Sequence, residues 1–485
     1  MSEQYILSID QSTSGTKALL FDSRGDLLCR NDSPHRQIVN EKGWVEHDLI
    51  EIYKNTVNVV RRVIVKSGID KSNVVGIGIS NQRETSAVWD KITGEPLYNA
   101  VVWQCSRGEQ ICKRIAEAGF SEKIREVTGL HLSPYFSAAK IAWILEHSLP
   151  KNRQLCAGNI DSWLIYKLTG NHKTDYSNAS RTQLFDLKTL QWSQEVCGLL
   201  NIEPSILPQV CYSDSCFGYT DFEGFFNSEI PIHGVMGDSH GALFGQGCHN
   251  PGMTKITYGT GSSIMMNIGN ELLHSDKGIV TSIAWGIDNK IDYVLEGNIN
   301  YTGAVIKWLV DELGLLESAE QSYKYSIMAN PDDETYLVPA FSGLGAPHWN
   351  SAARAVICGM SRTTGKAEIV KAAIECIAYQ IADVIDAMEE THGQKNGSLR
   401  ADGGPTRNKY LMQFQSDILD LPVIVPGHEE LSGIGCAYLT GIALNIFDKK
   451  EVFAHMDYTH YSPSMDNEVR TRKRGGWRAA LRMII

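Results

Sequence analysis

The chain has 485 residues, of which 43% are hydrophobic and 21% are charged, as in ordinary globular proteins. This length exceeds what one hydrophobic core usually supports, so we expect two large domains. The formal net charge of −11 argues against nucleic acid as a general partner, because nucleic-acid binding requires a basic surface.

The first half of the chain alternates strand and helix patterns. A loop of small polar residues, 11–16, separates two short apolar runs and predicts a β-hairpin. Apolar residues near a 3.6-residue period predict the first helix. The predicted elements are strands at 5–10, 17–21, 74–80 and 232–237, and helices at 48–68 and 137–147.

The second half begins again with a hairpin at 253–267, whose loop 259–263 is also small and polar. Helices follow at about 302–314 and 366–389, the second with a continuous apolar stripe, and a short strand covers 399–402. We place the domain boundary near 247–252. The fold class we expect is α/β, with domains at 1–247 and 248–485, an internal duplication and a cleft between them.

The two polar hairpin loops predict phosphate binding. Small residues with free backbone N–H groups and hydroxyls suit phosphate oxygens. Asp10 ends the first strand, where a carboxylate can hold Mg²⁺, and Lys17 supplies a cation. The alternative is an ordinary polar β-turn, and the repetition at 259–263 favours the phosphate interpretation. No Walker A loop or dinucleotide-binding GxGxxG motif is present.

Asp238 follows the strand at 232–237 and is the candidate general base for a hydroxyl nucleophile. The alternative is a helix N-cap, because Asp238 precedes a helix-like run. The two roles are compatible. Arg83 and Glu84 follow the strand at 74–80, at the edge where α/β sheets bind ligands. Their alternative is a surface ion pair. Trp103 and Tyr135 suit the carbon skeleton of a polyol, and their alternative is a place in the core.

Gly403 and Gly404, with Asn408 shortly after them, would let a nucleoside lie close to the backbone. The alternative is an ordinary strand-to-helix turn. The eleven cysteines are scattered, with no CxxC pair and no zinc-like spacing. The sequence starts directly with a strand pattern, and no apolar run approaches the ~20 residues of a membrane span. We therefore expect a reduced, cytoplasmic setting and no membrane partner.

Several longer motifs resemble the FGGY carbohydrate kinase family, and within it the glycerol kinases. The stretch 135–147 fits the family's first signature. The other matching segments are WVEHD at 44–48, SNQRET at 80–85, YNAVVWQC at 98–105, NASRT at 178–182, GLGAP at 343–347 and MQFQSDIL at 412–419. The resemblance implies two actin-like, ribonuclease-H-like domains that close around ATP, Mg²⁺ and a sugar or polyol, in a homo-oligomer (dimer or tetramer).

The resemblance also assigns roles to individual residues. It implies that Asp238 is the catalytic base and Asp10 the carboxylate that organises the metal. It implies that the polyol site contains Arg83, Glu84, Trp103, Tyr135, Asp238 and Ser239. It implies that the nucleotide site contains Thr13, Ser14, Gly15, Lys17, Thr260, Gly303, Lys307, Gly404 and Asn408.

Three of these positions, and Ser263 on the second hairpin, depart from the glycerol kinase pattern. Lys17 stands where an arginine is common, and Lys307 where a glutamine is usual. Ser239 replaces a glutamine and Ser263 a phenylalanine, and both changes exchange bulk for a small hydroxyl residue. A roomier, more polar pocket is expected to favour a four- or five-carbon polyol or ketose, such as erythritol, xylitol, xylulose or ribulose.

We therefore expect an ATP-dependent, glycerol kinase-like enzyme that phosphorylates a terminal hydroxyl of a small polyol or sugar. One alternative is a kinase for a larger polyol or ketose. Another is an actin- or chaperone-like ATPase that uses water as acceptor, although it has no need for the residues of a polyol pocket. A third is an inactive sugar sensor, against which the presence of Asp10 and Asp238 argues.

Overall fold

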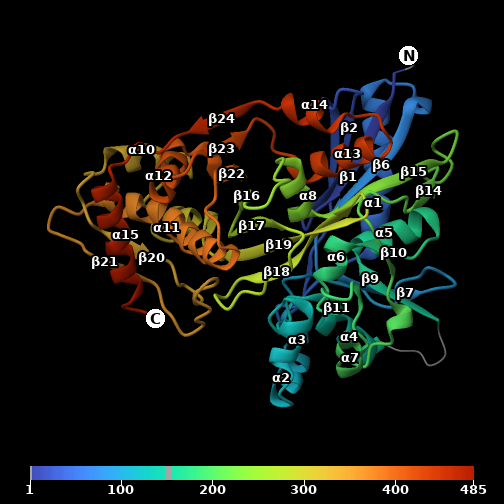
Figure 1. The fold of residues 1–485 in the computed structure, drawn as a ribbon, viewed down its shortest axis with the longest axis horizontal. Helices are drawn as coiled ribbons and strands as arrows, with labels where there is room; N and C mark the ends of the chain where they lie inside the picture. Colours follow the sequence, from blue (N-terminus) through green and yellow to red (C-terminus); the bar gives the residue numbers. More distant parts are fainter. Residues whose placement is uncertain (1–2, 149–153) are drawn as a thin grey trace.

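The computed structural model describes residues 3–148 and 154–485, which form two lobes (Figure 1). Each lobe contains a large mixed sheet. The first sheet has the order β14 (Gly218–Thr220), β15 (Ile230–Gly237), β6 (Val74–Asn81), β1 (Tyr5–Gln11), β2 (Gly15–Phe21) and β3 (Leu27–Pro34). The second has the order β18 (Val280–Ile287), β19 (Lys290–Ile299), β17 (Ser262–Gly269), β16 (Thr254–Tyr258), β22 (Leu399–Asp402), β23 (Val423–Pro426) and β24 (Tyr458–Tyr461).

The two sheets repeat one topology. β1 pairs antiparallel with β2 and parallel with β6, and β16 pairs in the same way with β17 and β22. The next strands also correspond, because β3 and β19 add antiparallel to the hairpins while β15 and β23 add parallel on the other side. The expected α/β fold with two related halves is confirmed, and each polar hairpin opens its own sheet.

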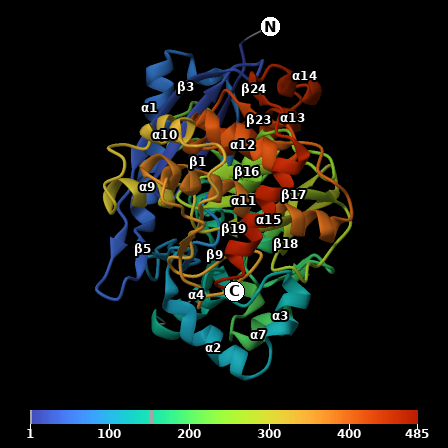
Figure 2. The ribbon, with the colours of Figure 1, turned by 90° about the vertical axis from the view of Figure 1, so that its left-hand side faces the viewer.

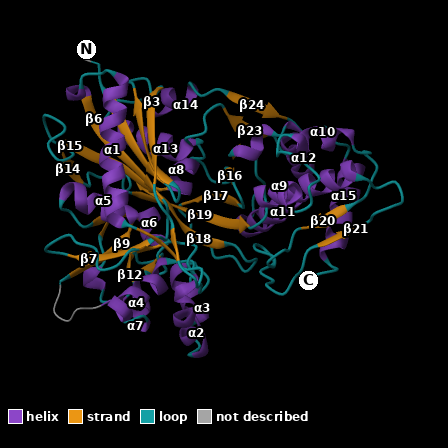
Figure 3. Cartoon of the chain, turned by 180° about the vertical axis from the view of Figure 1, so that it is seen from behind, coloured by secondary structure: helices purple, strands orange, loops and turns teal. Residues whose placement is uncertain are grey.

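The first sheet is covered by helices from both halves of the chain. One face, with Leu7 and Ile9, packs on α1 (Leu49–Ser67) and α5 (Ile160–Thr169). The other face, with Ile6 and Phe21, packs on α8 (Asp238–Gly245) and α13 (Leu431–Ala443). Figure 1 shows the orange-red α13 beside the blue strands of the first lobe, and Figure 3 shows the strands enclosed between helices. The division at 247/248 stays a prediction. Helix α13 lies after this division in sequence but packs on the sheet that precedes it.

The main core of the second lobe lies against α11 (Lys366–His392). The stripe that predicted this helix is buried, including Val370, Ile374 and Ile381, and it packs on the apolar face of the second sheet. Figure 2 looks onto this end of the molecule. The other helices of the lobe are α9 (Gly303–Asp311), α10 (Gln321–Met328), α12 (Lys409–Leu419), α14 (Lys449–Ala454) and α15 (Asn467–Leu481), and β20 (Tyr336–Val338) pairs with β21 (Val356–Cys358).

A smaller sheet in the first lobe supports part of the site. Its order is β4 (Ile38–Val39), β5 (Val45–His47), β8 (Ala100–Val101), β7 (Ser86–Asp90) and β9 (Leu155–Asn159). α4 (Ser137–Ser148) packs on it, and the lobe also contains α2 (Glu109–Glu117), α3 (Ser121–Thr128), α6 (Tyr176–Ser180) and α7 (Gln194–Leu199). The short pairs β10 (Lys173–Asp175) with β13 (Gln209–Cys211) and β11 (Phe185–Asp186) with β12 (Gln191–Trp192) complete the lobe.

The expected secondary structure is confirmed within a few residues at each end. The helix expected at 48–68 spans α1 because Asp48 and Gly68 are its caps: the Asp48 carboxylate accepts the Ile50 and Glu51 amides, and Gly68 takes a left-handed φ of 72°. Both boundaries of α1 are set by residues at its ends, which the sequence shows directly.

Candidate active site

The first hairpin turn exposes backbone and small side chains. The Ser12 amide donates to the Gly15 carbonyl at 2.9 Å, which closes the turn. A Cβ on Gly15 would lie 2.7 Å from the Ser33 carbonyl oxygen, so the turn needs a glycine here. Ser14 is exposed and Thr13 is partly exposed. The geometry of Thr13, Ser14 and Gly15 thus suits the phosphate loop that was expected of them.

Lys17 and Asp10 stand opposite each other on β2 and β1. The Lys17 Nζ lies 3.8 Å from Asp10 Oδ2 and 2.6 Å from Glu430 Oε2, which belongs to the turn before α13. Burial raises the pKa of Asp10 to about 6; Lys17 opposes this rise, and the Asp238 and Glu430 carboxylates add to it. The buried Oδ1 of Asp10 accepts no hydrogen bond. This oxygen is therefore available as a ligand for a bound cation.

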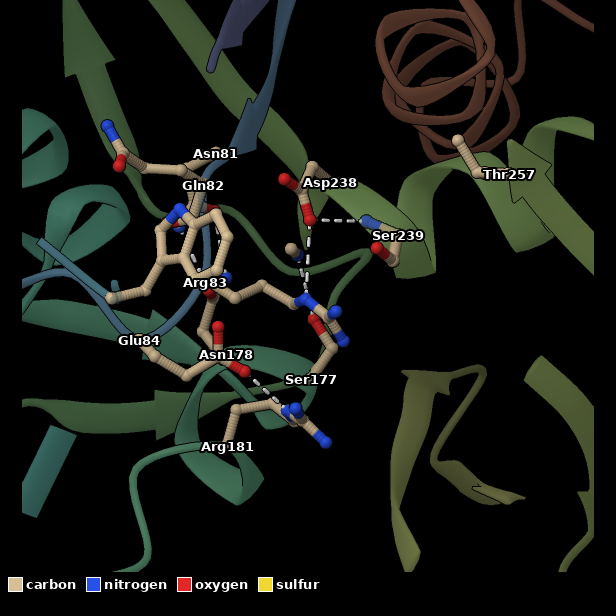
Figure 4. A network of polar contacts seen from close by, with 12 residues as sticks. Asn81, Gln82, Arg83, Glu84, Ser177, Asn178, Arg181, Asp238, Ser239 and Thr257 are labelled. Carbon is tan, nitrogen blue, oxygen red and sulfur yellow. Dashed lines mark hydrogen bonds and ion pairs between the residues drawn. The ribbon is translucent and has the colours of Figure 1, made fainter. Parts of the chain in front are cut away.

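Asp238 begins α8, directly after β15. Because β15 and β6 are parallel neighbours with Gly237 opposite Asn81, the residues after both strands leave the sheet side by side. Asp238 Oδ1 accepts the Ser239 amide at 2.6 Å and lies 3.3 Å from Arg83 Nε (Figure 4). Its side chain is 36% exposed, so it is held in place but open to a ligand.

Arg83 belongs to a buried group of four charges. It forms a two-armed ion pair with Glu296 on β19, at 2.8 and 2.9 Å. Arg181 lies 3.0 Å from the same Glu296, and its Nε donates to Glu84 Oε1 at 2.6 Å (Figure 4). Although burial acts to raise the pKa of Glu296, Arg181 and Arg83 hold it well below its usual range. Two cations and two anions balance, so each charge of this buried group has an opposite partner.

Glu84 also has an unusual backbone, with a φ of 59°. A left-handed conformation is uncommon for a residue with a Cβ, and such strain gathers at ligand sites. The Arg181 contact holds the Glu84 carboxylate, and Figure 4 shows the two side chains meeting below Arg83. Arg83 and Glu84 therefore do not pair with each other at the surface, because each has a buried partner elsewhere.

Trp103 and Tyr135 form an aromatic corner next to the first hairpin. Their rings meet edge to face with centroids 5.5 Å apart, and Trp103 Nε1 donates to the Thr13 hydroxyl at 2.9 Å. The buried Lys140 of α4 donates to the carbonyls of Tyr135 and Phe136. Burial lowers the pKa of Lys140 to about 7. The corner thus joins the expected phosphate loop to the expected polyol residues.

The expected nucleotide contacts of the second lobe line two cavities. Thr260, Gly303 and Lys307 border one of about 440 Å³, and Gly303, Lys307, Gly404 and Asn408 border another of about 690 Å³. The Gly303 amide donates to the Gly259 carbonyl at 2.9 Å, which brings α9 against the second hairpin. Lys307 is exposed and pairs with Asp311 in the next turn of α9.

Asn408 also has a structural task. Its carboxamide oxygen accepts the Leu411 amide at 3.1 Å, which caps α12, and its Nδ2 donates to Ser322 at 3.0 Å. The turn at Gly403 is tight, since a Cβ there would lie 2.0 Å from the Tyr258 carbonyl oxygen. The turn leads into a helix and also borders the larger cavity, so its contact with a nucleoside stays a prediction.

The structure adds residues to which sequence analysis gave no role, namely Arg181, Glu296 and Glu430. Glu296 carried a usable signal, because it directly follows the apolar residues Tyr293, Val294 and Leu295 of β19. Glu430 had no comparable signal. Within residues 3–148 and 154–485 no group of three or more His, Cys, Asp or Glu side chains gathers as a metal centre. In the same ranges every helix is too short or too polar to cross a bilayer.

Comparison with known proteins identifies the family. A family model described as the N-terminal domain of the FGGY family of carbohydrate kinases matches residues 5–245, and the model of the C-terminal domain matches residues 254–444. The chain belongs to the FGGY family of carbohydrate kinases. It is therefore a phosphotransferase, and its lobes have the actin-like, ribonuclease-H-like fold of that family.

Individual relatives agree with the family match over the full length. Glycerol kinase 1 of Thermotoga maritima is 46% identical over 490 residues, which cover 99% of each chain. Glycerol kinase of Bacillus licheniformis is 43% identical and covers 99% of this chain and 98% of its own. The structure of Plasmodium falciparum glycerol kinase with ADP superposes with a TM-score of 0.93 at 35% identity, covering 99% and 98% of the two chains.

Proposed function

We propose that this kinase transfers the terminal phosphoryl group of ATP to a terminal hydroxyl of glycerol. The observation that carries the proposal is the position of Asp238, a partly exposed carboxylate fixed by a buried arginine directly after a strand of the first sheet. Relatives named glycerol kinase, at 43–46% identity over the whole chain, support glycerol as the acceptor.

In the proposed reaction, Asp238 accepts the proton of the acceptor hydroxyl as its oxygen attacks the terminal phosphorus. Arg83 orients the carboxylate through its Nε, and its other nitrogens are committed to Glu296. Glu84 accepts hydrogen bonds from the polyol hydroxyls, and Trp103 and Tyr135 cover its carbon atoms. We assign catalysis to Asp238 and acceptor binding to Arg83, Glu84, Trp103, Tyr135, Asp238 and Ser239.

The phosphates are proposed to lie between the two hairpins. Thr13, Ser14, Gly15 and Lys17 would hold the terminal phosphate, and Thr260 would face it from the second hairpin. Gly303, Lys307, Gly404 and Asn408 would border the nucleoside, in the cavities that they line. Asp10 has an unpartnered oxygen suited to Mg²⁺, a cation that neutralises phosphate charge and needs few protein carboxylates.

The test is polyol-dependent formation of ADP by the purified chain. Glycerol should raise ADP production well above the rate with ATP and Mg²⁺ alone. If no polyol changes the rate of ADP formation, the kinase proposal is wrong and an ATPase of the actin or chaperone kind is favoured.

We also propose domains at 1–247 and 248–485 and a cytoplasmic homo-oligomer. Light scattering can check whether the oligomer is a dimer or a tetramer.

A second acceptor class is favoured by one feature of the second sheet. Thr257, Ser263 and Asn298 stand side by side on adjacent strands, and the buried Ser263 hydroxyl has no hydrogen-bond partner. Asn298 shares its face with Glu296, which reaches Arg83, so this polar row points toward the first lobe. With Ser239 beside Asp238, the row suits the additional hydroxyls of a four- or five-carbon polyol or ketose.

A substrate panel separates the two acceptor classes. It compares kcat/KM for glycerol, erythritol, xylitol, xylulose and ribulose under the same conditions. If glycerol exceeds all longer substrates by a wide margin, the second class is wrong. If a longer substrate gives the highest value, glycerol is not the preferred acceptor.

A further inference from the structure

Glu430 is a buried carboxylate that none of the steps above uses. It occupies the N-cap position of α13, yet its side chain accepts no capping hydrogen bond. Instead it reaches the first sheet and pairs with Lys17, at 2.6 Å, and with Arg30 of β3. Its side chain is 8% exposed, whereas that of Lys17 is 31% exposed. A fixed anion therefore holds a cation that remains open to the cleft.

The backbone of Glu430 is anchored independently of Lys17. The Ser8 hydroxyl donates to the Gly433 carbonyl at 2.8 Å, which joins β1 to the first turn of α13. A Cβ on Gly433 would lie 2.4 Å from Leu19 Cδ1, so the helix sits directly on β2. Glu430 cannot follow Lys17 when that side chain moves, because its helix is packed onto the sheet.

Arg30 makes the release of Lys17 physically reasonable. A buried carboxylate that loses its only cation is strongly destabilised. Here Arg30 stays paired with Glu430 after Lys17 leaves, and Asp32 lies 3.8 Å from Arg30 as a further exposed partner. Lys17 can thus exchange one anion for another while the charge of Glu430 remains compensated.

We propose that Glu430 is a positioning residue that holds Lys17 until a terminal phosphate replaces it. The inference rests on the proposed function, in which Lys17 meets the terminal phosphate of the nucleotide. The carboxylate and the phosphate compete for the same ammonium group, which also lies 3.8 Å from Asp10. The competition affects only a nucleotide that carries the third phosphate. Glu430 therefore lowers the affinity for ATP relative to ADP and leaves the binding of the nucleoside unchanged.

The experiment measures, by titration calorimetry without acceptor, the affinities for ADP and for a non-hydrolysable ATP analogue. In Glu430→Gln the analogue should bind about fivefold more tightly, as expected when a partly exposed ion pair no longer competes, while ADP binding stays the same. Adding Lys17→Met should abolish the difference between Glu430→Gln and its parent. Glu429→Gln is the matched control, because Glu429 is adjacent but exposed and pairs with Arg407.

A second variant covers the case in which Glu430→Gln fails to fold. Arg30→Gln removes the other cation from Glu430 at a half-exposed position, so Lys17 should be held more firmly. The ATP analogue should then bind about twofold more weakly, with little change for ADP. Equal shifts for the analogue and ADP, or no shift in either variant, would overturn the proposal. Because the measurement uses binding alone, a failure of polyol phosphorylation remains a separate result.

Discussion

Arg83 and Glu296 join the two halves of the chain by a buried, two-armed ion pair. Arg83 follows β6 of the first sheet and Glu296 belongs to β19 of the second, and 213 positions separate them in sequence. The same arginine touches Asp238 through its Nε. A contact between the lobes therefore fixes the carboxylate that we assign as the base.

Removing one member of this pair should cost much more than removing a surface pair. Glu296→Gln leaves two buried arginines without their shared anion and should lower the free energy of unfolding by about 3–5 kcal/mol. Glu146→Gln, which breaks the exposed pair with Arg114, should change it by less than about 1 kcal/mol. Urea denaturation measures both, and similar losses in the two variants would contradict the structural role of Glu296.

Asp238→Asn should separate catalysis from nucleotide binding. The amide cannot accept the proton of the acceptor hydroxyl, so kcat should fall by about 10²–10⁴. Nucleotide affinity should stay within about twofold, because the cavities that the nucleotide is proposed to fill do not include this residue. Steady-state kinetics and calorimetry give the two values. Unchanged turnover would remove Asp238 as the base.

Replacing the buried carboxylate of Asp10 by an amide should raise the stability of the protein and lower its activity. Its pKa is raised to about 6 from an ordinary 3.8, so the folded state holds this proton more tightly than the unfolded state between those values. Wild-type stability should therefore decline as pH rises from about 4 through 6, and the cost persists at higher pH.

The Asp10→Asn variant lacks this cost. Without divalent cations it should be more stable than wild type by about 2–3 kcal/mol at pH 7.5, and this advantage should vanish near pH 4. Urea midpoints at several pH values measure it. The variant should have little kinase activity. A wild type more stable than Asp10→Asn at pH 7.5 would contradict this prediction. It would show that contacts in the folded protein offset the cost of burying the Asp10 carboxylate.

Ser263→Phe tests the polar row of the second sheet. An aromatic ring at this position should cover Thr257 and Asn298 and shorten the acceptor pocket. We expect kcat/KM for four- and five-carbon substrates to fall at least about tenfold more than that for glycerol, as when a large group fills a fitted pocket. Equal losses for all acceptors would show that Ser263 does not border the substrate.

The fold could be predicted in large part because its signals are local. The polar loops at 11–16 and 259–263, the cap at Asp48 and the apolar stripe of α11 each lie within a few residues. They correctly predicted the hairpins, the first helix and the long helix of the second lobe. Asp238 could be singled out for the same reason, since it directly follows a strand.

The charge pairings could not be predicted, because they depend on how distant elements meet. Arg83 finds Glu296, and Lys17 finds Glu430, only after both sheets and α13 have packed. A glutamate before a helix most often reads as a local cap or a surface charge. Local pattern therefore identified the candidate base and the loops, while the residues that orient them required the structure.

Because α13 packs on the first sheet, that sheet can be completed only late in the synthesis of the chain. Residues 431–443 leave the ribosome after some nine-tenths of the chain, yet they complete the face of the first sheet that contains Ile6 and Phe21. Until then this apolar face lacks its cover and presents a surface that favours aggregation. Nascent chains arrested before Leu431 should therefore bind chaperones through the first lobe, although every strand of that lobe has already been made.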